Sequence, residues 1–207
     1  MDDTVLIEKI KTGEKELYKV IIQKYNQRLY RIARSIVKNE DELEDILQDT
    51  YLKAYVNLSK FRNDAQFSTW LVRILINNAN ASLNKAKRWV QLLFDVADHG
   101  SDPRENSDHK LSNGELKKIL EDAIDTLPEN LRSVYLMREV EHLSVNETAD
   151  ILEISPENVK IRLHRAKSIL KNRLYDKSSS EIDLFRFGNE RFEKVPLAVM
   201  LQIGKQN

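Results

Sequence analysis

Apolar residues recur at steps of three and four along most of this chain, which is the period of amphipathic α-helices. Three such stripes precede residue 90, and three helices joined by short loops can close one core. Five glycines and four prolines in 207 residues also disfavour a turn-rich β fold. The pattern therefore predicts an all-α fold. The stripes comprise Leu17, Val20, Ile21, Tyr25, Leu29, Ile32, Ala33 and Ile36; Leu43, Ile46, Leu47, Thr50, Tyr51, Ala54 and Leu58; and Phe67, Trp70, Leu71, Ile74, Leu75 and Ala79.

A polar segment divides the chain into two helical regions. Residues 95–109 contain five acidic residues and one basic residue among Gly, Pro, Ser and Asn, which is typical of a flexible linker. Helical periodicity resumes near Leu116, and Pro128 suits the first turn of a further helix. We therefore expect two small helical domains, at residues 1–90 and 113–176. They are joined by an acidic linker at 91–112 and followed by a C-terminal extension at 177–207.

The second region carries the pattern of a helix-turn-helix. Ser144 and Glu147 have the spacing of a capping box, so a short helix is expected to start after Ser144. Ser155 followed by Pro156 predicts the N-cap and first position of the next helix. Ala149 allows the two helices to cross closely, and Val159 is placed to close the angle between them. This arrangement is the helix-turn-helix plan.

The second helix of this motif has two distinct faces. At about 100° per residue, one side holds the apolar residues and is predicted to face the core. Ile161 falls on the opposite side, which is unusual for a solvated helix. An aliphatic side chain there suits a major groove, where thymine methyl groups offer apolar contact. The core side consists of Val159, Leu163, Ala166 and Leu170, and the outer side of Glu157, Ile161, His164, Arg165 and Ser168, with Asn158 and Lys160 at the margins.

The formal net charge is zero, but charge is strongly segregated along the chain. Residues 39–49 contain six acidic and no basic residues, whereas residues 157–174 contain six basic residues and one acidic residue. Residues 73–88 contain four basic and no acidic residues. A polyanion responds to such local charge, although each block taken alone is equally consistent with a solvated helix face.

Composition argues against several classes of protein. The chain has no cysteine, which excludes disulfides and thiolate metal sites. No apolar run suits a signal peptide or a membrane span, so a cytoplasmic protein without membrane insertion is expected. The four histidines are scattered, Gly-rich phosphate loops are absent, and no metal-ligand spacing occurs. We therefore expect no enzymatic activity, no metal and no cofactor.

Two sets of motifs resemble the extracytoplasmic-function (ECF) sigma factors of bacterial RNA polymerase. The resemblance covers roughly residues 10–88 and 113–174, in the order found in that family and without an intervening domain. The first set is Asp45-Ile-Leu-Gln48-Asp49-Thr50, Phe61-Arg62, Phe67-Ser-Thr69-Trp70-Leu71-Val-Arg73-Ile74 and Asn77; the second is Leu127-Pro128, Leu131-Arg132, Leu143-Ser144, Glu147-Thr148-Ala149 and Val159-Lys160-Ile-Arg162-Leu163-His-Arg165-Ala166-Lys167.

The resemblance implies roles for specific residues. It implies a sigma region 2-like bundle and a sigma region 4-like helix-turn-helix domain. The partners it implies are RNA polymerase core, promoter DNA and an anti-sigma factor. Core binding is expected from Asp45, Gln48 and Asp49; minus-ten DNA binding and melting from Asn63, Asp64, Gln66, Ser68, Arg73, Asn77, Asn80, Lys85, Lys87 and Arg88; and minus-thirty-five binding from Ser155, Glu157, Asn158, Lys160, Ile161, Arg162, His164 and Arg165. Phe61, Phe67 and Trp70 have the chemistry to stack bases, but helical spacing favours a core position for Phe67 and Trp70.

The chain departs from the family pattern at four positions. Ala81, Asn84 and Lys85 stand where the family often has an acid or Asn followed by an Arg pair near the end of the third helix. Glu153 stands where glycine is usual at the helix-turn-helix corner, and a positive φ there implies strain of about 1 kcal/mol.

Two other functions fit parts of the sequence. One is a helix-turn-helix regulator that binds an operator as a dimer. An acidic helix, an amide-rich loop and a basic helix have no role in such a repressor. The other is a sigma-like protein that does not initiate transcription, for which the departures at Ala81 and Asn84 are the argument.

The C-terminal extension is too apolar to remain in water. Residues 181–203 contain eleven large apolar residues, and Pro196 suits the start of a short last helix. We expect this segment to dock. It either extends the core of the second domain and stabilises it, which we favour, or bridges the two domains.

Overall fold

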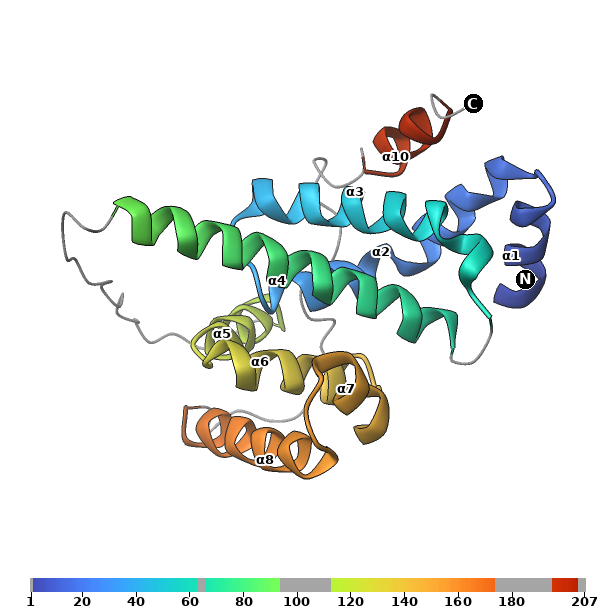
Figure 1. Cartoon of the computed structure of the whole chain (residues 1–207). Helices are drawn as coiled ribbons and strands as arrows, with labels where there is room; N and C mark the ends of the chain where they lie inside the picture. Colours follow the sequence, from blue (N-terminus) through green and yellow to red (C-terminus); the bar gives the residue numbers. More distant parts are fainter. Residues whose placement is uncertain (1, 63–65, 94–112, 174–194, 205–207) are drawn as a thin grey trace.

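The computed structural model of this chain describes residues 2–62, 66–93, 113–173 and 195–204, and within them it forms only helices (Figure 1). This confirms the predicted all-α fold. Of the linker expected at 91–112, residues 91–93 belong to the end of α4, which is longer than predicted, and residues 94–112 lie outside the described residues. The first domain contains α1 (Asp3–Lys11), η1 (Lys15–Leu17), α2 (Tyr18–Arg34), α3 (Glu40–Val56), η2 (Leu58–Lys60) and α4 (Phe67–Leu93). The second contains α5 (Asn113–Asp125), α6 (Glu129–Tyr135), η3 (Leu136–Val140), α7 (Val145–Leu152) and α8 (Pro156–Arg173); α10 (Val195–Gly204) follows.

The first domain closes around helices α2, α3 and α4, as the three apolar stripes predict. Tyr18 and Tyr51 are fully buried between α2 and α3. The Tyr18 hydroxyl donates to the Tyr51 carbonyl at 2.6 Å, and the Tyr51 hydroxyl donates to the Ile22 carbonyl at 3.3 Å. These bonds satisfy the two phenols in an apolar interior, where an unpaired polar group is costly.

The start of α3 is fixed by its cap and its charges. The Asn39 side chain accepts hydrogen bonds from the backbone N–H groups of Asp41 and Glu42, at 2.9 and 3.2 Å. Acidic residues in the first turn also interact favourably with the positive end of the helix dipole. The acidic block at residues 39–49 therefore helps to form the helix on which the predicted polymerase contact lies.

The second domain contains the predicted helix-turn-helix in α7 and α8. The Ser144 hydroxyl accepts from the Glu147 N–H at 3.1 Å, and the Glu147 carboxylate accepts from the Ser144 N–H at 2.8 Å. This is the predicted capping box. Ser155 caps α8 by accepting from the Asn158 N–H at 3.2 Å. Ala149 and Val159 are buried together with Val134 and close the corner as expected.

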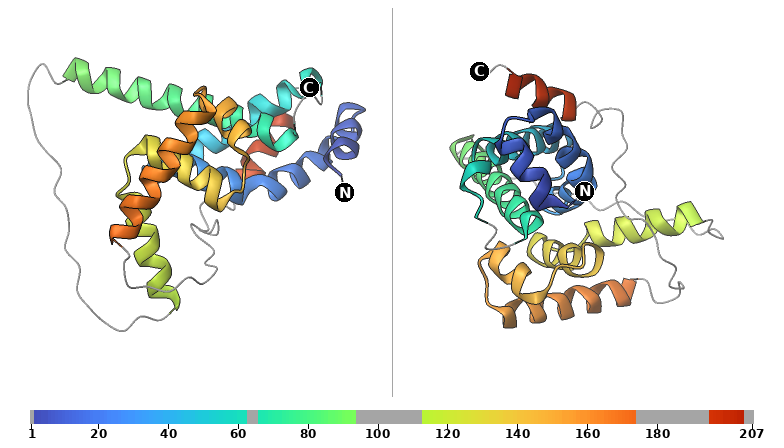
Figure 2. Two further views of the ribbon diagram at one scale, coloured as in Figure 1. Left: turned by 90° about the horizontal axis from the view of Figure 1, so that it is seen from below. Right: turned by 90° about the vertical axis from the view of Figure 1, so that its right-hand side faces the viewer.

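The C-terminal helix α10 docks on the first domain, which corrects our expectation for this segment. It packs against α2 and α3, on the side away from α5 to α8 (Figure 2, right). Val199 and Ile203 are buried in the core that these helices share. Helix α10 therefore packs on the first domain, whereas residues 177–194 and 205–207 of the extension lie outside the described residues. The start of α10 at Val195, beside Pro196, agrees with the predicted last helix.

Candidate polymerase and nucleic-acid interfaces

The acidic face of α3 is available to a partner. Asp45 and Asp49 are exposed, and Gln48 beside them is half-buried. The Gln48 amide donates to the Glu44 carboxylate at 3.3 Å, which holds the amide along the helix surface. The helix register brings the three predicted core-binding residues to one side of α3, at the spacing of neighbours on a helix.

The outward face of α4 carries exposed polar side chains. Arg73, Asn77, Asn80 and Asn84 are exposed at steps of three and four residues. Ala81 is exposed on the same face. Lys85, Lys87 and Arg88 continue α4, but their side chains lie outside the described residues, as do Asn63 and Asp64 in the preceding loop. The structure thus brings the amides and Arg73 together on one surface.

The aromatic residues at the start of α4 belong to the core. Phe61 and Phe67 are 6% and 4% exposed, and Trp70 is half-buried. Their rings lie 5.3 to 5.5 Å apart between centroids, within the range of favourable aromatic pairs. The predicted core position of Phe67 is confirmed, and in this conformation neither Phe61 nor Phe67 presents a ring to a base.

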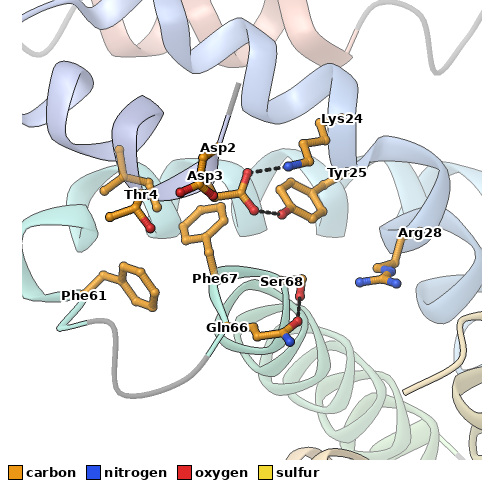
Figure 3. Close-up of a pocket in the computed structure, with 11 residues that line it drawn as sticks. Asp2, Asp3, Thr4, Lys24, Tyr25, Arg28, Phe61, Gln66, Phe67 and Ser68 are labelled. Carbon is orange, nitrogen blue, oxygen red and sulfur yellow. Dashed lines mark hydrogen bonds and ion pairs between the residues drawn. The ribbon is translucent and has the colours of Figure 1, made fainter. Parts of the chain in front are cut away.

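A cavity of about 680 Å³ lies beside the residues predicted to bind the minus-ten element (Figure 3). Gln66 and Ser68 line one wall, where Ser68 is buried and 3.5 Å from the Gln66 side chain. The opposite wall comes from α1 and α2. There Asp3 binds the Lys24 ammonium at 2.6 Å and accepts a hydrogen bond from the Tyr25 hydroxyl. Burial, followed by the hydrogen bond to Asp3, raises the pKa of Tyr25, so the phenol stays protonated.

A second cavity, of about 400 Å³, lies between the end of α3 and α4. It is lined by Lys53, Asn57, Lys60, Trp70, Ile74, Asn77 and Asn78. Lys53 donates to Asn78 at 2.6 Å and Lys60 donates to Asn57 at 3.0 Å, which holds both lysine side chains at the cavity that Asn77 also lines. Two lysines and an aromatic ring suit a nucleic-acid strand.

Sequence reasoning missed the first-domain residues that accompany the predicted minus-ten set. Lys53 and Lys60 lie outside the basic block at residues 73–88, and Asp3 and Lys24 belong to helices for which no site was expected. The helical period of α3 places Lys53 one turn after Asp49, which is the one signal that pointed toward it. Asp3 on α1 and Lys60 on η2 reach the cavities because these elements pack on the bundle, and Lys24 reaches its cavity from α2.

The recognition helix α8 presents the face that the sequence predicts. Val159, Ala166 and Leu170 are buried, whereas Ile161 is 49% exposed. The other residues predicted to bind the minus-thirty-five element are arranged around Ile161. Ser155, Glu157, Asn158, Lys160, His164 and Arg165 are exposed, and Arg162 is half-buried. An exposed aliphatic side chain within a basic helix face is suited to the major groove.

Comparisons with known proteins agree with this architecture. The sequence matches the family described as Sigma-70 region 2 over residues 21–89, and that described as Sigma-70, region 4 over residues 117–170. It is 28% identical to the ECF RNA polymerase sigma-E factor of Haemophilus influenzae, covering 84% of this chain and 96% of that protein. It is 29% identical to the ECF RNA polymerase sigma factor SigW of Bacillus subtilis, covering 82% of this chain and 95% of that protein.

Two solved structures share the fold. One is the sigma factor RpoE from Bartonella quintana, crystallised with the anti-sigma factor NepR, with a TM-score of 0.60 and 22% identity over 82% of this chain and 99% of that one. The other is CnrH in complex with the cytosolic domain of CnrY, with a TM-score of 0.57 and 22% identity over 84% and 97% of the two chains.

No helix in the described part of the chain is both long and apolar enough to cross a membrane. The two family matches follow one another in the order of the two domains and together span more than half of the sequence. Both matched families are regions of sigma factors, which are transcription factors and not enzymes. The chain is therefore a member of the ECF RNA polymerase sigma factors, with sigma-70 regions 2 and 4.

Proposed function

We propose that this chain binds RNA polymerase core, directs it to promoters and opens the DNA there. The observation that carries the proposal is the pairing of two DNA-suited surfaces on one chain. These are the exposed Ile161 face of α8 and the amide-rich outward face of α4. A helix-turn-helix regulator needs the first surface and has no use for the second. This activity takes place in the cytoplasm, where polymerase and chromosome are found.

The first domain is assigned two tasks. Asp45, Gln48 and Asp49 on α3 contact the polymerase, because acids exposed on one helix face suit a basic or amide-rich partner. The α4 face and the preceding loop take the minus-ten element, in which a base leaves the stack and its edge is read by amides and carboxylates. Asn63, Asp64, Gln66, Ser68, Asn77 and Asn80 are assigned to that reading, and Arg73, Lys85, Lys87 and Arg88 to phosphates.

The second domain is assigned to the minus-thirty-five element. Arg165 and His164 lie beside Ile161 and reach base edges, while Lys160 and Arg162 hold the backbone. Ser155, Glu157 and Asn158 at the helix start complete the set, since the N-terminal part of a recognition helix enters the groove. An anti-sigma factor is a further proposed partner, supported by the fold relative from Bartonella quintana that was crystallised with an anti-sigma factor.

The test of this proposal is run-off transcription with core polymerase on a library of promoters. A specific transcript that requires both core and this chain is the expected result. Binding of duplex promoter DNA by the chain alone, without any transcript, supports a helix-turn-helix regulator instead. Binding to core without a transcript supports a sigma-like protein that does not initiate transcription. The exposed Ala81 and Asn84 are the argument for that alternative.

The polymerase contact is tested by charge reversal. Asp49→Lys is expected to weaken co-purification with core at least about tenfold, the scale expected when one charge pair at an interface is lost. Glu157→Lys is the matched control, because it reverses an equally exposed acid on α8. Unfolding temperatures should stay close to the parent's, since exposed acids contribute little to stability. Equal core binding by Asp49→Lys and the parent contradicts the assignment.

Base reading is tested by comparing two cations of α8. Arg165→Ala is expected to lose about 1–3 kcal/mol of discrimination at one position of the minus-thirty-five element, the magnitude of a bidentate guanine contact. Lys171→Ala is expected to weaken binding to all sequences alike, because a phosphate contact carries no base information. Equal losses on matched and altered elements for Arg165→Ala contradict the claim that it reads a base.

A further inference from the structure

Two sides of helix α3 are fixed by side-chain contacts with neighbouring helices. Thr50 and Lys53 face α4, because Asn78 of that helix donates to the Thr50 hydroxyl at 3.0 Å and accepts from the Lys53 ammonium at 2.6 Å. Tyr51 faces α2, because its hydroxyl donates to the Ile22 carbonyl at 3.3 Å. These contacts set the rotation of α3 about its own axis, and they therefore decide which of its residues face away from both neighbours.

A third side of α3 lies next to the side that faces α2, and helix α10 covers it. At about 100° per residue, this third side carries Glu44, Gln48 and Tyr55. Helix α10 packs against both α2 and α3, and α4 already fills the groove on the opposite side of this pair (Figure 1). The three side chains are half-buried, whereas Asp45 and Asp49, further around the helix, are exposed. Helix α10 thus covers the side of α3 that carries Gln48 and leaves the two acids open.

Docking of α10 depends on apolar side chains. Val199 and Ile203 are buried, and α10 contains no charged residue, so no ion pair of its own side chains holds it in place. A helix of ten residues is too short to be stable in water by itself. Its folding and its docking are therefore coupled, and a partner that takes its place on α2 and α3 releases it as a whole.

The proposed core-binding set spans the edge of the surface that α10 covers. Asp45 and Asp49 are accessible to a partner while α10 is docked. Gln48 instead lies on the covered side, where its amide donates to the Glu44 carboxylate at 3.3 Å. A partner that contacts all three core-binding residues must occupy the side of α3 on which α10 lies, so the partner and α10 exclude one another sterically.

We propose that α10 and RNA polymerase core compete for the surface formed by α2 and α3, so that the C-terminal helix covers this surface in the free chain and leaves it when core binds. The two exposed acids receive core first, and the contact of core with Gln48 then displaces α10. The inference rests on the proposed function for the identity of the partner. Its consequence is that the apparent Kd for core rises in inverse proportion to the fraction of chains whose α10 is undocked.

Hydrogen exchange of the full chain, with and without saturating core polymerase, measures the displacement without any substitution. Amides of α10 are expected to exchange at least about tenfold faster when core is bound, because a short helix released into water loses its protection. Amides of α3 are expected to exchange more slowly, since core covers that helix. Slower exchange in α10 means that it forms part of the interface, and unchanged exchange means that it sits apart from core; either result overturns the proposal.

A matched pair of substitutions in α10 measures the competition as an affinity. Ile203→Asn places an amide at a buried position and is expected to undock α10, whereas Leu201→Asn makes a similar change at a position that is 58% exposed. With about 10% or fewer of the parent molecules undocked, the usual population of a minor state, Ile203→Asn is expected to lower the Kd for core at least about tenfold. Leu201→Asn should leave the Kd unchanged. Equal Kd values for Ile203→Asn and the parent, or equal gains for the two variants, overturn the proposal.

Loss of structure cannot imitate the expected gain in affinity, because a destabilised first domain binds core less tightly. Circular dichroism melting shows whether Ile203→Asn is folded at the temperature of the binding measurement. If Ile203→Asn is unfolded there, the exchange of α10 in the parent decides.

The outcomes also separate this proposal from the proposed function. Core-dependent transcription without release of α10 overturns only the competition. Release of α10 by core without a specific transcript leaves the competition standing and contradicts the role in initiation. A chain that fails to bind core, both as the parent and as Ile203→Asn, overturns both.

Discussion

The Glu147 carboxylate at the start of α7 accepts hydrogen bonds from the Ser144 N–H and the Thr69 hydroxyl. The Ser144 N–H and the Ser144 hydroxyl, followed by the Thr69 hydroxyl, lower the pKa of Glu147 below its usual range. A carboxyl with a lowered folded-state pKa stabilises the protein above its unfolded pKa of about 4.3 and loses that contribution as pH falls through the folded value. The capping box therefore makes α7 sensitive to acid.

The first prediction concerns this pH dependence. Glu147→Gln is expected to destabilise the chain near pH 7 by about 0.5–2 kcal/mol, the usual range for a helix cap. The difference from the parent should shrink as pH falls below about 4. Urea unfolding at several pH values measures it, with Asp150→Asn on the same helix as control. A difference that stays constant down to pH 3 contradicts the assignment of the effect to the ionised cap.

The second prediction also belongs to a single residue. Glu153 has φ 53° and ψ 44° at the end of α7, a left-handed conformation that costs a residue with a Cβ about 1–2 kcal/mol. Glu153→Gly is expected to stabilise the second domain by about 0.5–1 kcal/mol, because glycine adopts this conformation freely but gains entropy when unfolded. Glu153→Ala keeps the Cβ and should change little. The unfolding temperatures of both variants test this prediction. If Glu153→Gly and Glu153→Ala shift the unfolding temperature equally, backbone strain is not the cause.

At the scale of helices, α10 is the element whose role the structure changes most. Ile203 and Val199 are buried against α2 and α3, whereas Leu201 on the outer side is 58% exposed. Burying one such side chain contributes about 1.5–3 kcal/mol from the removal of apolar surface from water. Docking of α10 therefore stabilises the helix that carries Asp45 and Asp49.

The third prediction tests this docking by hydrogen exchange. Ile203→Ala is expected to speed amide exchange in α2 and α3 and to lower stability by up to about 2–5 kcal/mol, limited by the free energy at which α10 detaches. Leu201→Ala is the matched control and should leave exchange unchanged. Faster exchange confined to α5–α8 would show that the extension docks on the second domain in solution.

Structural features that are determined by residues close together in the sequence could be predicted. Features that depend on contacts between residues far apart in the sequence could not. The capping box at Ser144 and the outward face of Ile161 follow from spacing within one helix. The docking of Val199 on the first domain does not, because the apolar pattern shows that a segment must be buried without showing where. The cavity wall from Asp3 and the pairing of Arg31 with Glu141 likewise depend on tertiary packing.

At the scale of the whole molecule, the domains are held together by contacts that differ in their response to salt. Arg28 on α2 pairs with Glu141 at 3.1 Å and Arg34 pairs with Asp125 at 2.8 Å, and these arginine side chains are 30% and 25% exposed. Such pairs weaken as the Debye length falls from about 10 Å at 0.1 M to about 3 Å at 1 M salt. The hydrogen bond from Arg132 to Ser35 is buried and is screened much less.

The fourth prediction is that the chain expands with salt without unfolding. Small-angle scattering at 0.1 and 1 M NaCl should show a larger radius of gyration at high salt, while helical content by circular dichroism stays the same. Glu141→Gln should start from a larger radius and change less, because it removes the pairs of Glu141 with Arg28 and Arg31 and leaves only the pair of Arg34 with Asp125 for salt to weaken. A radius that is independent of salt in both proteins means that apolar contact between α4 and α7, rather than charge, holds the domains together.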